Sequence, residues 1–324
     1  MLRTLQGGLA VVALGIGALT GPASAQDYPS RAVKIIVPFG AGGPADIYAR
    51  VIAHHLQESL KQSFVVEARP GAGSLTGTAE VAKSPADGYT LLMMSNTHTV
   101  NETLRPNRPF VLMKDFVPVA PVNYSDLIMV IHPSVPAKDL KEFLALAKSK
   151  SGDLNYASSG AGTPYHMAGE LFKAMSGTDI VHVPHKASGD ARTAVLGGHV
   201  QMMIDAITTT APTVQGGQLR ALGTTGKTRS SLLPDVPTVA EAGVPGYEAT
   251  IWLGIMAPTG TPKDIVDKLN AEINKVLARP DVVAAWAKQG AVPIVMSPAQ
   301  FDAYLRGDID KWAKVIATAG LKPQ

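Results

Sequence analysis

The sequence predicts an α/β protein with two lobes that are joined by two extended crossings. Apolar, β-branched stretches alternate with stretches of helical spacing, which is the pattern of a parallel sheet covered by helices on both faces. A Gly-Ala-Gly triplet recurs at residues 40–42, 71–73 and 160–162, each time before an expected helix start. The alternation breaks at residues 116–133 and 247–258, which are extended, apolar and without an obvious partner helix. Two crossings between two lobes would explain both breaks.

The stretch at residues 33–47 shows the first strand–loop–helix unit most clearly. Its apolar run ends at Pro38, a glycine-rich turn follows, and apolar residues then recur at helical spacing up to Leu60. Glycines allow backbone N–H groups to approach a ligand, and the helix start behind them favours negative charge. The loop has neither the lysine nor the hydroxyl of a phosphate loop, so we interpret it as a cradle for a small carboxylate. The alternative is an ordinary turn whose glycines serve only the backbone.

The three glycine loops are expected at corresponding places, because ligands bind at the carboxyl ends of strands in such sheets. The second loop follows the strand at residues 64–67, and the third follows the strand at residues 154–157. The strand at residues 89–94 ends at the polar Ser95 and Asn96. The ligand-binding candidates from these loops and strand ends are Phe39, Gly42, Gly43, Gly73, Ser74, Ser95, Asn96, Ser158, Ser159 and Thr163.

The two pattern breaks also predict how the chain is divided between the lobes. Lobe 1 is expected to comprise residues 26–123 and 250–324, and lobe 2 residues 124–249. Helices are expected at residues 262–277, 282–288 and 298–319 after the second crossing.

The first 25 residues have the features of a secretion signal. Arg3 supplies the charged start, residues 9–19 the apolar core, and Ala23-Ser24-Ala25 the small-residue cleavage site. We therefore expect a soluble, exported protein. The chain has no cysteine, which excludes disulfides, thiolate metal sites and a cysteine nucleophile.

The charge pattern argues against a nucleic-acid partner. The formal net charge is +3 at pH 7, and no basic run stands out. We expect no cofactor and no metal. No nucleophile–base pair can be named from the sequence either, so an enzyme is disfavoured.

Several motifs together resemble one family. They are YPSRAVKIIVPFGAGGPAD at residues 28–46, RPGAG at 69–73, PADGYTL at 85–91, LNY at 154–156, GAGT at 160–163, HVP at 182–184, LGGHVQ at 196–201 and LPDVPTVAEAG at 233–243. In these motifs the chain resembles the periplasmic solute-binding proteins of the tripartite tricarboxylate transporter family, also called Bug receptors. The likeness runs from Tyr28 to the C-terminus.

The resemblance implies a type II periplasmic-binding-protein fold, a Venus flytrap with two crossover strands. It also implies a monomer that holds a small carboxylic acid in its cleft, by backbone N–H groups, hydroxyls and water, and delivers it to a membrane permease. His166 belongs to the matching stretch after the third loop. Two positions depart from the family pattern: His185 stands where relatives usually carry tyrosine, and Ala68 where they usually carry asparagine.

Four further side chains have two readings each. Asp46 beside an anion site would repel the ligand, so it is expected to stabilise the helix start or to orient water. Asp205 either binds a ligand group or water at the cleft, or caps the following helix. His185 either lines the cleft, where its charge could make binding pH-dependent, or faces water. Tyr165, like Phe39, either covers an apolar ligand body or packs in the core.

Three classes of function remain open from the sequence. A transport receptor is favoured, a ligand-presenting sensor subunit needs the same two lobes, and an exported α/β enzyme lacks a recognisable catalytic set. The ligand could be a dicarboxylate, a tricarboxylate, an aromatic carboxylate or an amino acid.

Overall fold

The computed structural model describes residues 28–318 and 320–323, so the expected secretion signal lies outside the described residues. The strands are β1 (Val33–Val37), β2 (Phe64–Ala68), β3 (Thr90–Ser95), β4 (Phe116–Ile131), β5 (Asn155–Ser158), β6 (Val181–Pro184), β7 (Met202–Ala206), β8 (Arg220–Thr224), β9 (Thr250–Pro258) and β10 (Ala291–Pro293). The helices are α1 (Pro44–Leu60), η1 (Ala72–Ser74), α2 (Leu75–Ala82), α3 (Asn96–Leu104), α4 (Leu112–Asp115), α5 (Leu140–Ser149), α6 (Pro164–Ser176), α7 (Ser188–Leu196), α8 (Ile207–Gln215), α9 (Lys263–Leu277), α10 (Pro280–Ala287) and α11 (Pro298–Thr318).

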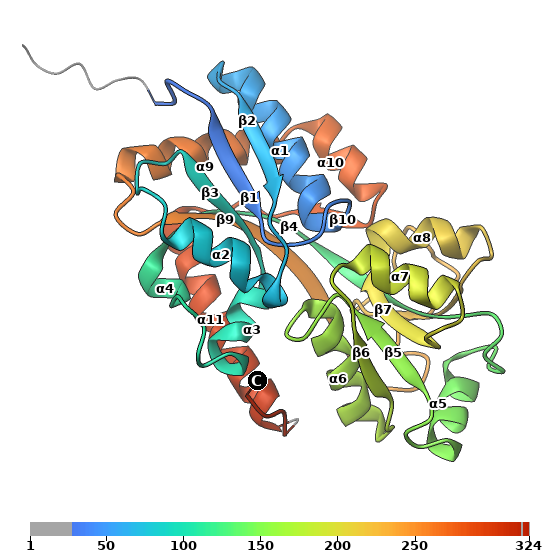
Figure 1. Cartoon of the computed structure of the whole chain (residues 1–324). Helices are drawn as coiled ribbons and strands as arrows, with labels where there is room; N and C mark the ends of the chain where they lie inside the picture. Colours follow the sequence, from blue (N-terminus) through green and yellow to red (C-terminus); the bar gives the residue numbers. More distant parts are fainter. Residues whose placement is uncertain (1–27, 319, 324) are drawn as a thin grey trace, which may run out of the picture.

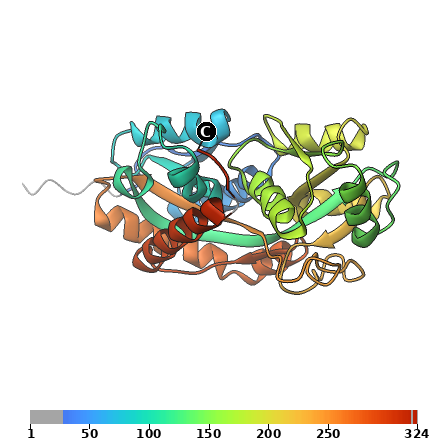
Figure 2. The same ribbon diagram turned by 90° about the horizontal axis from the view of Figure 1, so that it is seen from below.

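Ten strands form two sheets that share one long strand, and each sheet builds one lobe (Figure 1). The first sheet has the order β2-β1-β3-β9-β4, with β10 on β4, and the second has the order β4-β7-β5-β6, with β8 on β4. β4 pairs with β9 up to Asp126 and with β7 from Leu127 onward. In Figure 2 this green strand runs from one lobe into the other. The two-lobed α/β prediction is therefore confirmed.

The sheets are mixed, whereas the alternation of strands and helices predicted parallel sheets. β1 is parallel to both β2 and β3, and β5 is parallel to both β6 and β7. β4 is antiparallel to β7, β8, β9 and β10, and β9 is also antiparallel to β3. The reason is that a chain that crosses to a second lobe and returns must run in opposite directions along the two crossings.

Each sheet has helices on both faces, because alternate strand residues point to opposite sides. In the first sheet, Ile35 and Leu91 pack with residues of α1, α9 and α10, while Ile36 and Leu92 pack with residues of α2, α4 and α11. In the second sheet, α5 and α6 pack on one face, and α7 and α8 on the other. The helices cover the faces of the sheets, so the carboxyl ends of the parallel strands stay uncovered. The loops that follow these strand ends face the space between the two lobes. In the described residues no helix has both the length and the apolar character needed to cross a bilayer.

Candidate ligand-binding cleft

A cavity of about 460 Å³ lies between the two lobes, where the loops after β1, β2, β5 and β6 meet. It brings together many of the residues that were selected from the sequence. Those that line it are Phe39, Gly43, Gly73, Ser74, Ser95, Ser159, Thr163, Tyr165 and His185. Six others do not line it: Gly42, Asp46, Asn96, Ser158, His166 and Asp205.

The first loop is held by Asp46 from outside the cavity. The Gly42 N–H donates to Asp46 Oδ2 (3.0 Å), and the guanidinium of Arg50 pairs with the same carboxylate (2.8 Å). Arg50 neutralises the carboxylate, so Asp46 shapes the loop without presenting a free negative charge to the cleft. Gly43 precedes α1 and supplies no side-chain cap, and the first helical residue, Pro44, has no N–H, so the N–H groups of Ala45 and Asp46 are the ones at this helix start that are available to a ligand.

The second loop is unusual in its backbone. Ala72, Gly73 and Ser74 all have positive φ angles, of 47°, 62° and 79°. Such a run is costly for residues other than glycine and is typically found where function requires it. Ser74 lines the cavity and is only 2% exposed, and its Oγ is buried without a hydrogen-bond partner among the described residues. This hydroxyl is a ready donor for an anion.

A buried histidine connects the second loop to the start of α3. The Ser95 N–H donates to His98 Nδ1 (3.2 Å), and His98 Nε2 lies 2.9 Å from the hydroxyl of Thr78. That hydroxyl donates in turn to the carbonyl of Ser74 (2.8 Å). Burial lowers the pKa of His98 to about 4, so the ring is neutral near pH 7. Asn96, which follows Ser95, does not line the cavity, and its Nδ2 donates a hydrogen bond to the carbonyl of Thr250 in β9 (3.0 Å).

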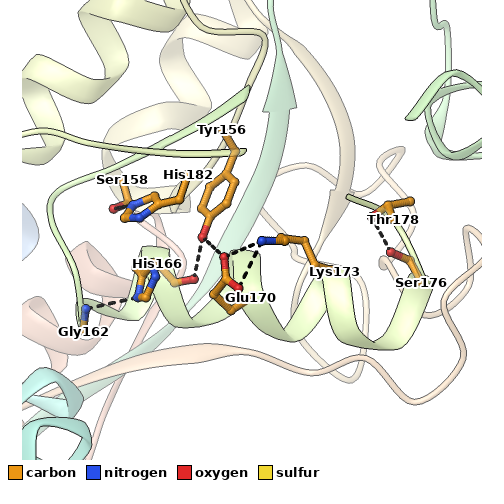
Figure 3. A network of polar contacts seen from close by, with 9 residues as sticks. All are labelled: Tyr156, Ser158, Gly162, His166, Glu170, Lys173, Ser176, Thr178 and His182. Carbon is orange, nitrogen blue, oxygen red and sulfur yellow. Dashed lines mark hydrogen bonds and ion pairs between the residues drawn. The ribbon is translucent and has the colours of Figure 1, made fainter. Parts of the chain in front are cut away.

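The third loop is held by two more histidines (Figure 3). His182 Nε2 lies 2.6 Å from Ser158 Oγ, which accepts the Gly160 N–H (3.1 Å). His166 Nδ1 accepts the Gly162 N–H (3.1 Å). Burial is the main reason that the pKa of His166 falls to about 4 and that of His182 to about 3. Ser158 and His166 therefore position the loop, while Ser159 and Thr163 line the cavity.

Ser158 and His182 have the contact distance of a nucleophile–base pair, but their surroundings differ from those of one. Ser158 is fully buried and does not line the cavity. Its hydroxyl is already used by the backbone of the loop, and an imidazole whose pKa is lowered to about 3 is a weak base. The pair therefore acts as a support for the glycine loop.

Asp205 is also a structural residue in this arrangement. Its Oδ2 accepts hydrogen bonds from Arg192 Nη2 (2.7 Å) and from the Thr210 hydroxyl (2.7 Å), while its Oδ1 has no partner among the described residues. The side chain is completely buried and lies outside the cavity lining.

The charge of the lining favours an anion, and the sequence reasoning missed the residue that contributes most to it. Lys186 lines the cavity beside His185, and among the described residues no aspartate or glutamate does so. His185 Nε2 is buried and has no hydrogen-bond partner among the described residues. The signal available in the sequence was the position of Lys186 directly after His185 at a strand end.

Part of the cavity lining is apolar. Phe39 and Tyr165 belong to it, together with Ile251 and Leu253 of the crossing strand β9, and both aromatic rings also pack against the buried core of their lobe. Phe39 is fixed edge-on against His98, with ring centroids 5.9 Å apart. The cavity thus combines polar loops with a surface for a hydrocarbon body.

Comparisons with known proteins identify the family. The family model described as "Tripartite tricarboxylate transporter family receptor" matches residues 48–321. The chain is 39% identical to Protein BugT of Bordetella pertussis over 317 residues, which cover 97% of this chain and 96% of BugT.

Solved structures agree with this match. The protein described as "R. palustris Rpa4515 with adipate" superposes with a TM-score of 0.89 at 34% identity, covering 92% of this chain and all of that one. MatC from Rhodopseudomonas palustris with bound malate gives a TM-score of 0.84 at 32% identity, covering 89% of this chain and all of MatC. The chain therefore belongs to the family of tripartite tricarboxylate transporter receptors, the Bug-type solute-binding proteins.

Proposed function

We propose that this protein is a periplasmic receptor that binds a small carboxylic acid between its lobes and delivers it to a membrane permease of the tripartite type. The observation that carries the proposal is the composition of the cavity lining. Three glycine-containing loops, Ser74 and Lys186 line a space that no acidic side chain of the described residues lines, and the Ser74 hydroxyl has no hydrogen-bond partner among those residues. Backbone and hydroxyl donors can hold a carboxylate there, and a lysine adds the opposite charge.

The same lining allows the possible ligand classes to be ranked by how well they fit. A lining that combines apolar side chains with polar loops suits an acid with a hydrocarbon body, which includes dicarboxylates and aromatic carboxylates. An amino acid would also need a partner for its ammonium group, and no carboxylate from the described part of the chain lines the cavity. We therefore place acids without an amine first. The related structures named with adipate and with malate support this order.

We further propose that the lobes comprise residues 26–123 with 250–324, and residues 124–249. The change of β4 partner between Asp126 and Leu127 supports a hinge close to these boundaries. A monomer is sufficient for the proposed function, because both walls of the cavity come from one chain.

Native mass spectrometry of the purified protein, followed by calorimetry with adipate and malate, tests the proposal. We expect an added mass that corresponds to a carboxylic acid, or saturable binding of one of these acids. A protein that binds neither these acids nor any acid from a broader panel would contradict it. Uptake of the bound acid in cells that carry a permease of the tripartite type, and its loss on deletion of the receptor, would distinguish transport from ligand presentation to a sensor.

A further inference from the structure

The two lobes touch at a glycine. Gly40 lies in the loop after β1, and Ala187 lies between β6 and α7 in the other lobe. A Cβ atom on Gly40 would be only 2.5 Å from the Cβ of Ala187. Non-bonded carbons prefer about 3.5–4.0 Å, so a side chain at residue 40 would hold the lobes at least about 1 Å farther apart.

The backbone of Gly40 does not itself require glycine. Its φ lies outside the left-handed region, unlike that of Gly42, where φ is 75° and nothing lies within 4 Å of an added Cβ. The constraint at residue 40 therefore comes from the opposite lobe, and the constraint at residue 42 comes from the local turn.

Other contacts show that the lobes are closed around the cavity. A Cβ on Gly73 would be 2.8 Å from the carbonyl oxygen of Ala161 in the other lobe. Met167 of α6 is completely buried in a cluster with residues of α3 and α11, which belong to the first lobe. Figure 2 shows α6 and α11 close together on this side of the molecule.

We propose that Gly40 is a positioning residue for lobe closure: its missing side chain leaves the space that Ala187 fills when the cleft closes. The two residues act as a pair, and the bulk of one is tolerated only because the other has none. This inference rests on the proposed function, in which the lobes close on a carboxylate. It assigns to the first glycine loop a role in addition to ligand contact.

A double-mutant cycle separates contact between the lobes from contact with the ligand. Both residues line the cavity, so Gly40→Ala alone could weaken binding by either route. Removing the opposing methyl group with Ala187→Gly relieves a clash between lobes and leaves a clash with the ligand unchanged. We expect Gly40→Ala to weaken adipate binding at least tenfold in calorimetry, and the double variant to bind within about twofold of the wild type.

Gly189→Ala is the matched control. Its added Cβ meets nothing within 4 Å, its φ lies outside the left-handed region, and it is only two residues from Ala187. We expect unchanged adipate affinity. If the double variant stays as weak as Gly40→Ala, or if Gly40→Ala binds as tightly as the wild type, the proposal is overturned.

A second measurement needs no ligand. The chain has no cysteine, so the pair Gly40→Cys and Ala187→Cys introduces the only two thiols. A disulfide needs Cβ atoms about 3.5–4.5 Å apart, which the closed arrangement reaches after a shift of about 1 Å. We expect mild oxidation to join the two residues and to reduce the radius of gyration in small-angle scattering. Failure to form the bond, or a bond without compaction, would count against the closure contact.

The two ideas can fail separately. A protein that forms the compact disulfide but binds no carboxylate keeps the closure contact and loses the proposed function. A protein that binds adipate but shows no coupling between residues 40 and 187 keeps the proposed function and loses the closure contact.

Discussion

Replacing Asp205 with asparagine should lower the stability of the protein and leave its ligand affinity unchanged. The carboxylate is fully buried and neutralises Arg192, whose side chain is only 17% exposed. Asp205→Asn keeps the size of the side chain and removes its charge, so the guanidinium is left without a counter-ion. Removing one partner of a buried ion pair typically costs about 3–5 kcal/mol. The small exposure of Arg192 places the expected loss near the lower figure, at about 3 kcal/mol.

That loss can be measured in two ways. For about 300 folded residues, 1 kcal/mol corresponds to roughly 1.6 °C in Tm, so the variant should unfold about 5 °C below the wild type. Urea titration should show the loss as a lower midpoint with an unchanged slope. Calorimetry on the folded variant should give the wild-type Kd for the acid, because Asp205 lies outside the cavity lining.

A paired substitution provides the control. Arg192→Met combined with Asp205→Leu removes both charges and should recover most of the lost stability, because apolar residues of similar volume replace buried ion pairs at little cost. The reasoning is refuted if Asp205→Asn keeps its stability and loses affinity, since the carboxylate would then serve the ligand.

Three further predictions concern charge and pH. Burial, followed by the nearby Glu248, raises the pKa of Asp126 to about 6, so stability should fall as the pH rises from about 4 to above 6. Asp126→Asn should therefore raise the free energy of unfolding by about 1 kcal/mol at pH 7.5, a value discounted for partial exposure, and leave it unchanged at pH 4, as measured by urea titration. Asp310→Asn, at an exposed position, should not raise the free energy of unfolding at either pH. The fold lowers the pKa of His182, so the stability that the neutral ring provides is lost as the pH falls below about 6.5. In His182→Gln the free energy of unfolding should therefore decrease less steeply with falling pH than in the wild type. Lys186→Met should weaken adipate binding about fivefold and reduce its salt dependence, in calorimetry at two ionic strengths.

Each of these predictions has an outcome that contradicts it. An Asp126→Asn gain that persists at pH 4 would mean that the carboxylate charge is not its source. If the wild type and His182→Gln lose stability identically in acid, protonation of the His182 ring does not contribute to that loss. Equal salt dependence in the wild type and Lys186→Met would show that the lysine charge does not reach the ligand, and Lys138→Met, outside the lining, serves as the control.

The sequence was sufficient for the parts of the fold that depend on local patterns. β1 and its glycine loop, the helix that follows them and the two crossings could all be predicted, because apolar periodicity and turn residues specify them over short distances. β10 could not, because three residues carry no periodicity and its pairing depends on β4, far away in the chain. The antiparallel directions of β4 and β9 likewise follow from the lobe arrangement.

The candidate site was predicted at the level of loops better than at the level of side chains. Backbone position places Gly73 and Ser159 at the cleft, but the direction of a side chain depends on its packing partners. Asp205 lies near the end of β7, as the sequence predicted, but its carboxylate pairs with Arg192 outside the cavity lining. Lys186 was missed because exposed lysines are common, and only the structure shows that this one lines a cavity.

The position of β9 has a consequence for how the chain is assembled during synthesis. β9 lies between β3 and β4 in the first sheet, but it follows both of them by more than a hundred residues. Until residues 250–258 emerge, β3 has an unpaired edge that carries Leu91, Met93 and Met94, and such edges invite association with other chains. All strands of the second sheet are made by Thr224, so that sheet can form while the first is still incomplete. A chain truncated before β9 should therefore expose an aggregation-prone edge, and the last 75 residues carry the information that closes it.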